Sequence, residues 1–268
     1  MKNFWIAVLV LALAGCQSVQ TTQPGAVGVD RSQSMLVSSK QINDSAKKAY
    51  AETMQQAAQK GLLNRDAAQT ARVRAVAARL IGQTGAFRTD APGWQWEVNV
   101  VTAKEVNAWC MPGGKIAVYT GILDGLKLTD EELAAVMGHE IAHALREHGR
   151  ERASQAMAQG LLIGVLGAVA GLSGTTQDLS RTVLDLTFNL PNSRQDETEA
   201  DRIGVELAAR AGFDPRAAVT LWQKMDQKGG GSSPEFLSTH PAGQTRIADL
   251  RVVSEKVMPL YEKARPVR

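Results

Sequence analysis

The stretch His139-Glu140-Ile141-Ala142-His143 places two imidazoles and one carboxylate within five residues. On a helix, residues i and i+4 lie one turn apart on the same face, so both histidines can direct a ring nitrogen at one metal ion. Glu140 follows the first histidine directly, where its carboxylate can reach a water beside the metal without binding the metal. This pattern is typical of zinc peptidases.

The residues around the motif predict a helix. Thr129-Asp130-Glu131-Glu132 matches a capping box, and apolar residues then recur at helical spacing. From Thr129 onward, we expect nothing to break this helix until Gly149. On a continuous helix His148 lies about 140° around from His143, so we interpret it as structural or exposed rather than as a ligand. The alternative for the whole motif is a helix that merely carries two surface histidines.

A third metal ligand is predicted downstream, because catalytic zinc usually takes three protein groups. Residues 197–201, Glu-Thr-Glu-Ala-Asp, lie on a helix expected over residues 193–211. Glu197 and Asp201 share a face of that helix. Glu197 is therefore the expected ligand, and Asp201 is expected to hydrogen-bond a ligand imidazole and fix its tautomer. Glu199 points to another face and is expected to be solvated.

Four segments in order resemble a known family. HExxH followed by ExxxD resembles the gluzincin peptidases, and ETEADRIG at 197–204 resembles the family of HtpX, BepA, LoiP and the CAAX prenyl proteases. Residues 107–119, NAWCMPGGKIAVY, and residues 238–241, STHP, are similar to two further family segments. The resemblance covers roughly residues 41–250. It implies a zincin-like metallopeptidase domain that holds one Zn²⁺ per chain.

The resemblance also implies a mechanism. Zinc lowers the pKa of a bound water to about 7 and polarises the scissile carbonyl. Glu140 is then the general base, which takes a proton from the water and passes it to the leaving amine. In relatives, a histidine of the THP segment lies near the metal. The resemblance therefore implies that His240 is either transition-state support or a removable fourth ligand; the alternative is a loop histidine held by Pro241.

The N-terminus predicts an export signal. Lys2 precedes an apolar run over residues 4–14, which suits a signal peptide and is too short to span a bilayer. Leu13-Ala14-Gly15-Cys16 resembles a bacterial lipobox, which implies lipidation of Cys16. Because Gln17 is not aspartate, the usual sorting pattern favours the outer membrane, with the protein facing the periplasm.

Three regions follow from this reading: a signal peptide over residues 1–15, a lipidated and flexible tether over 16–39, and the metallopeptidase domain over 40–268. Once Cys16 is lipidated, Cys110 has no cysteine with which to form an intramolecular disulfide. Cys110 is then a small buried hydrophobe, or else a thiol that reacts or forms an intermolecular disulfide in an oxidising compartment. The net charge of +3 is too small to indicate nucleic-acid binding.

The apolar patterns predict an α+β fold, mostly helical with a small β-sheet. Strands are expected over 94–101 and 115–119, and further helices over 42–59, 64–83, 215–227 and 243–260. Residues 160–174 are apolar but too short to cross a membrane as a helix, and we expect them to pack over the active site. The alternative is contact with a membrane or a partner. Residues 175–194 are expected to be a mobile cover on the cleft.

Substrate recognition is expected along a strand edge, where an extended peptide pairs through main-chain hydrogen bonds. Such pairing tolerates many side chains, so unfolded or misassembled envelope proteins are the predicted substrates. The alternative is a chaperone-like lipoprotein that binds outer-membrane assembly intermediates with little proteolysis. Hydrolysis of a cell-wall amide is a third, less favoured interpretation.

Overall fold

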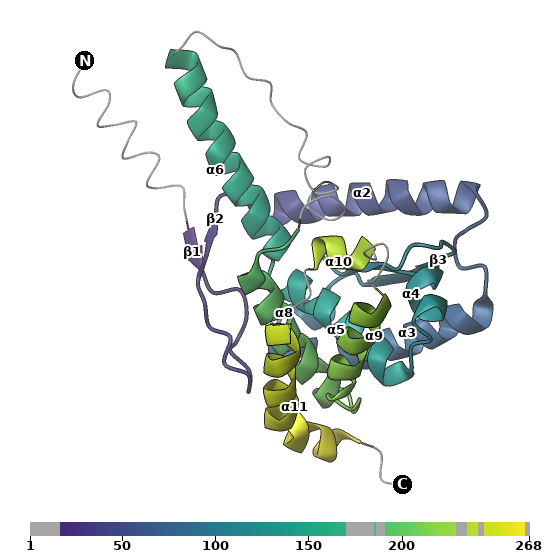
Figure 1. Cartoon of the computed structure of the whole chain (residues 1–268). Helices are drawn as coiled ribbons and strands as arrows, with labels where there is room; N and C mark the ends of the chain where they lie inside the picture. Colours follow the sequence, from purple (N-terminus) through teal and green to yellow (C-terminus); the bar gives the residue numbers. More distant parts are fainter. Residues whose placement is uncertain (1–16, 170–184, 186–190, 229–234, 241–243, 266–268) are drawn as a thin grey trace.

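The computed structural model describes residues 17–169, 185, 191–228, 235–240 and 244–265. The signal peptide, Cys16 and most of the expected cover lie outside these residues. The described elements, in chain order, are β1 (Gln17–Val19), β2 (Gln33–Met35), α2 (Ser39–Gln59), α3 (Ala67–Ile81), the 3-10 turns η1 (Thr84–Ala86) and η2 (Ala91–Gly93), β3 (Glu97–Val101), β4 (Ala108–Met111), β5 (Lys115–Tyr119), α4 (Thr120–Gly125), α5 (Asp130–Leu145), α6 (His148–Val169), α8 (Arg194–Arg210), α9 (Ala217–Lys228), α10 (Glu235–Thr239) and α11 (Gln244–Ala264) (Figure 1). The predicted fold class, α+β with mostly helices and a small sheet, is confirmed.

The central sheet has the strand order β3-β5-β4, with β3 parallel and β4 antiparallel to β5. Strand β5 is therefore central, and β3 and β4 are the two edge strands. The edge strand that packs against α5 is β4, which the sequence did not predict. Its four residues are all buried and so lack polar alternation: Ala108 and Cys110 face the main core, whereas Trp109 and Met111 pack with α2.

Helices α5 and α8 cross at two glycines. A Cβ on Gly138 would lie 2.8 Å from the carbonyl oxygen of Gly204, and a Cβ on Gly204 would lie 2.7 Å from the amide nitrogen of His139. Any side chain at these positions would push the two backbones apart. The glycines therefore allow the close approach that brings the HExxH helix and the ExxxD helix together.

We expect Gly204→Val to lower the free energy of unfolding by about 1–3 kcal/mol, because overpacking forces shifts in the surrounding backbone. Urea denaturation measures this change. The matched control is Gly160→Ala in α6, where an added Cβ meets no described atom within 4 Å; the control is expected to gain about 0.5–1 kcal/mol from helix propensity. Equal stability of Gly204→Val and the natural sequence would contradict the close crossing.

Residues 17–38 form a strap, called here the N-terminal strap, that packs on the helical body. Strands β1 and β2 pair antiparallel, and the Val27 amide donates to Glu206 Oε2 at 2.9 Å. Val27, Val29 and Met35 are buried. The expectation of a flexible tether is therefore wrong for these residues. The strap is held by individual contacts rather than by a periodic apolar face. Its sequence therefore shows no regular apolar pattern and resembles that of a linker.

The helix that starts at Asp130 ends earlier than predicted. Helix α5 stops at Leu145, and Glu147 adopts a left-handed conformation with φ of 52° before α6 starts at His148. The Glu147 carboxylate accepts from Arg88 at 2.9 Å and from Arg150 at 2.5 Å, which compensates for the unfavourable backbone. His148 therefore does not continue the helix that carries His143.

Helix α6 leaves the body after its first two turns (Figure 1). Residues 155–160 are exposed. The segment 160–174, which was expected to pack over the active site, lies almost entirely outside the residues whose side chains the structure describes. Within the described residues, no helix combines the length and the hydropathy needed to cross a membrane.

Candidate metal centre

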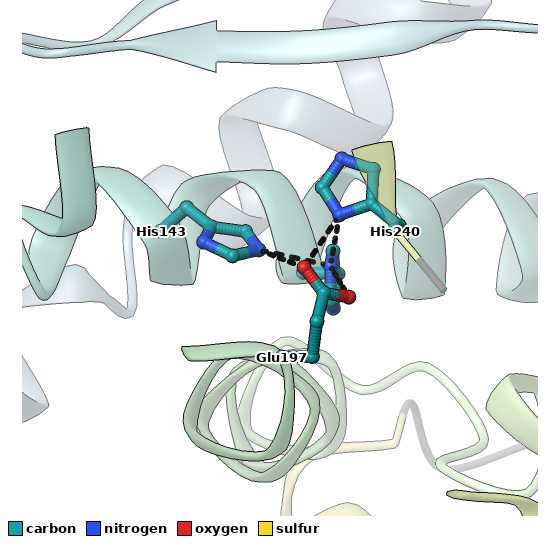
Figure 2. A group of neighbouring side chains, drawn as sticks. His143, Glu197 and His240 are labelled. Atoms are coloured by element: carbon teal, nitrogen blue, oxygen red, sulfur yellow. Dashed lines mark hydrogen bonds and ion pairs between the residues drawn. The ribbon is translucent and has the colours of Figure 1, made fainter. Parts of the chain in front are cut away.

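Four buried side chains from three parts of the chain converge on one point. His139 and His143 come from α5, Glu197 from α8, and His240 directly follows α10. One ligand atom from each lies within 4.8 Å of the others. Figure 2 shows His143 and His240 both pointing toward the Glu197 carboxylate.

The distances describe a compact donor set. The Nε2 atoms of His139 and His143 are 3.1 Å apart, and Nδ1 of His240 lies 3.1 Å from His139 Nε2 and 2.9 Å from Glu197 Oε1. Three imidazole nitrogens and a carboxylate suit zinc in a four-coordinate site. The three ligands predicted from the sequence are thus brought together, and His240 joins them.

The other nitrogen of His139 shows which tautomer the site favours. Its Nδ1 lies 2.9 Å from Asp201 Oδ1, and an ionised carboxylate only accepts hydrogen bonds. The proton of His139 therefore sits on Nδ1, which leaves the Nε2 lone pair facing the other donors. Lone pairs packed this closely repel one another unless a cation lies among them, so the residues fit a bound metal ion.

Arg246 was not predicted as part of the site. Its guanidinium lies 2.8 Å from Glu197 Oε2, binds Asp201 Oδ2 at 2.6 Å and stacks 3.4 Å above the Trp222 ring. Arg246 therefore orients both acidic residues of the ExxxD motif. No sequence motif marks it, because it is one of 30 basic residues and lies at the start of a helix recognisable only by its apolar spacing.

Glu140 lies beside this donor set, with Oε1 3.4 Å from His240 Nε2. No described residue hydrogen-bonds Oε1 of Glu140. Burial raises the pKa of Glu140, although the nearby His240 and His139 and a hydrogen bond with the Cys110 backbone act in the opposite direction. Strand β4 packs against α5, the helix that carries Glu140.

The pKa of Glu197 is shifted in the opposite direction to that of Glu140. Burial also acts to raise its pKa, but the imidazoles of His240 and His139 beside it outweigh burial and hold the pKa of Glu197 well below its usual range. Two neighbouring carboxyl groups are thus tuned apart: Glu197 stays ionised, as a metal ligand must, whereas Glu140 accepts a proton more readily. Such separation is typical of a site that assigns acid–base and electrostatic roles to different carboxylates.

Glu199 is buried, so the expectation that it is solvated is wrong. Its carboxylate accepts hydrogen bonds from Arg31 Nε at 2.5 Å and Arg146 Nε at 2.8 Å, and it lies 3.2 Å from His148 Nε2. Burial opposes ionisation, but hydrogen bonds from His148 and Arg31 outweigh it and lower the pKa of Glu199 to about 2. The N-terminal strap covers the helix face that was expected to meet solvent.

Comparison with known proteins agrees with this geometry. Residues 67–254 match peptidase family M48. The chain belongs to this family. The M48 match includes all four donor residues together with Glu140 and Asp201, and it confirms the resemblance inferred from the motifs at the level of the family.

Three relatives show how similar this chain is to known proteins. The mitochondrial metalloendopeptidase OMA1 of Arabidopsis thaliana is 41% identical over 169 residues, which span 62% of this chain and 34% of that protein. OMA1 of Schizosaccharomyces pombe is 41% identical over 155 residues, 57% of this chain and 45% of that protein. The beta-barrel assembly-enhancing protease of Escherichia coli K12 is 32% identical over 175 residues, 60% of this chain and 35% of that protein. The matched region spans less than half of each relative.

Proposed function

We propose that this protein is a zinc-dependent endopeptidase. The observation that carries the proposal is the meeting of His139, His143 and Glu197 beside Glu140, whose carboxylate has a raised pKa. The metalloendopeptidase names of its M48 relatives support the same activity.

In the proposed mechanism, His139, His143 and Glu197 would hold the zinc. Bound zinc would act as a Lewis acid that polarises the scissile carbonyl and makes water more acidic. Glu140 takes a proton from the attacking water and delivers it to the leaving nitrogen of the cleaved peptide bond. Asp201 and Arg246 hold His139 and Glu197 in place during this transfer. Burial of Glu140 favours the proton-bearing state that it must occupy between the two steps.

Edge strand β4 is the proposed binding site for the substrate backbone. It lies at the edge of the sheet and packs against α5, the helix that carries Glu140. An extended peptide that adds to this edge is held by main-chain hydrogen bonds and therefore needs no particular side-chain sequence. This supports unfolded or misassembled proteins as substrates.

The proposed location is the bacterial outer membrane, through a lipid on Cys16, with the catalytic body in the periplasm. The lipobox-like sequence supports this location. The name of the Escherichia coli relative, a beta-barrel assembly-enhancing protease, supports misassembled envelope proteins as the substrate class.

Cys16→Ser is expected to release the protein from the membrane fraction, because the variant lacks the thiol that would carry the lipid. Retention of that variant in the membrane fraction would contradict the anchor.

A second candidate function is a chaperone-like lipoprotein that binds assembly intermediates and cleaves little. The observation that favours it is the presence of His240 among the donor atoms, since four protein ligands would close a zinc site that catalysis needs open.

Metal removal tests the enzyme proposal. We expect the purified protein to hold about one zinc per chain. We further expect it to degrade casein, to lose this activity on chelation and to regain it when zinc is restored. Casein cleavage that persists in fully chelated protein, or a zinc-loaded protein that cleaves no unfolded substrate, would contradict the proposal.

A further inference from the structure

His148 is a buried histidine that the proposed mechanism does not use. It is fully buried, and its Nδ1 lies 2.8 Å from Nδ1 of the metal residue His143. Its other nitrogen, Nε2, lies 3.2 Å from Glu199 Oε2. His148 therefore bridges a metal-site imidazole and a carboxylate that lies away from the metal.

Chemistry assigns the hydrogens in this series of contacts from His143 through His148 to Glu199. Glu199 is held by two arginines and is ionised, so it only accepts, and His148 Nε2 must donate to it. When His148 is neutral it carries one N–H, and its Nδ1 is then an acceptor. His143 Nδ1 must then donate to His148. Nε2 of His143 is left with its lone pair directed at the donor set, the state that a metal ligand needs.

The N-terminal strap extends this series of hydrogen bonds to Arg31. Arg31 of the strap donates to Glu199 at 2.5 Å and pairs with Glu151 through two hydrogen bonds of 2.6 and 2.9 Å. The Arg31 carbonyl in turn accepts from Arg146, a fully buried residue that also binds Glu199. The position of the Glu199 carboxylate thus depends on a segment more than a hundred residues away in sequence.

We propose that Arg31, Glu199 and His148 form a relay through which the N-terminal strap positions His143 as a zinc ligand. This inference rests on the proposed zinc site. All three are positioning residues, because none reaches the substrate or the reacting atoms. The relay makes the strap a part of the metal centre, although it lies outside the region that matches family M48.

The test measures zinc affinity by competition with a chromogenic chelator, using the full mature chain rather than an isolated domain. We expect His148→Leu to weaken zinc binding about 10–100-fold, as is typical for loss of a hydrogen-bond partner behind a ligand histidine. His148→Gln keeps one acceptor and one donor and is expected to recover most of the affinity. Arg31→Met is expected to weaken binding in the same direction, by about tenfold.

Glu206→Gln is the matched control, because Glu206 also anchors the strap to α8, through the Val27 amide, but takes no part in the relay. We expect its zinc affinity to equal that of the natural sequence. Thermal unfolding of the metal-free variants shows whether each one folds.

Three outcomes would overturn the relay: unchanged zinc affinity in folded His148→Leu and Arg31→Met, equal losses in His148→Leu and His148→Gln, or a loss in Glu206→Gln as large as in Arg31→Met. Zinc uptake by the natural sequence separates this proposal from the enzyme proposal. If the natural sequence binds no zinc, both fail; if it binds zinc with unchanged affinity in the relay variants, only the relay fails.

Discussion

Glu140→Gln is expected to lower kcat/KM for an unfolded protein by about 10²–10⁴-fold while zinc binding is retained. Glutamine has nearly the same shape as glutamate but cannot take the proton from water. Glu140 is not among the four donors that meet at the metal centre, so its loss should leave zinc stoichiometry unchanged. Casein degradation and zinc analysis on the same sample measure both expectations.

Glu131→Gln is the matched control for this substitution. Glu131 is an exposed residue in the first turn of the same helix, so its replacement removes the same charge far from the metal centre. We expect its activity to match that of the natural sequence. Full casein cleavage by zinc-loaded Glu140→Gln would exclude Glu140 as the general base.

The same variant separates the two proposed functions in cells. If Glu140→Gln fails to replace the natural protein, proteolysis is required for its role. If the variant binds zinc and restores the cellular function completely, the chaperone-like role is the better account. Equal amounts of both proteins in the membrane fraction are needed for this comparison.

The residues whose positions could be predicted from the sequence are those that depend on local geometry. Spacing within one helix puts His139 and His143 on a common face, and the capping box at Thr129 fixes where that helix starts. Glu197 and Asp201 follow from the same periodicity on α8. Such features need no knowledge of the rest of the chain.

The features that the sequence missed depend on contacts between distant segments. Glu147 takes a left-handed conformation without glycine or proline to announce it, because Arg88 and Arg150 bind its carboxylate. Glu199 is buried only because the N-terminal strap lies over it. Each of these contacts joins residues that no local pattern relates. Periodicity therefore predicted a continuous helix through Glu147, a solvated Glu199 and a flexible linker in place of the N-terminal strap.

The second large effect is expected at His240, where removal of the side chain should open the metal centre. With His240 Nδ1 2.9 Å from Glu197 Oε1 and 3.1 Å from His139 Nε2, the histidine occupies the position that catalysis must free. We therefore expect His240→Ala to bind zinc on the order of 10-fold more weakly, because one ligand is lost. We also expect more cleavage of casein per zinc-loaded molecule.

The other role considered for His240, support of the transition state, predicts different results for zinc affinity and for kcat. A histidine that only stabilises the transition state would leave zinc affinity unchanged, and its loss would reduce kcat by about 10²–10³-fold. Thr239→Ala is the control, because Thr239 is buried next to His240 and, within the described residues, its hydroxyl makes only a long 3.4 Å hydrogen bond to the Phe236 carbonyl. Chelator competition together with cleavage rates at saturating zinc distinguishes the two roles. Unchanged zinc affinity with a large fall in kcat would show that His240 acts on the substrate and does not close the metal centre.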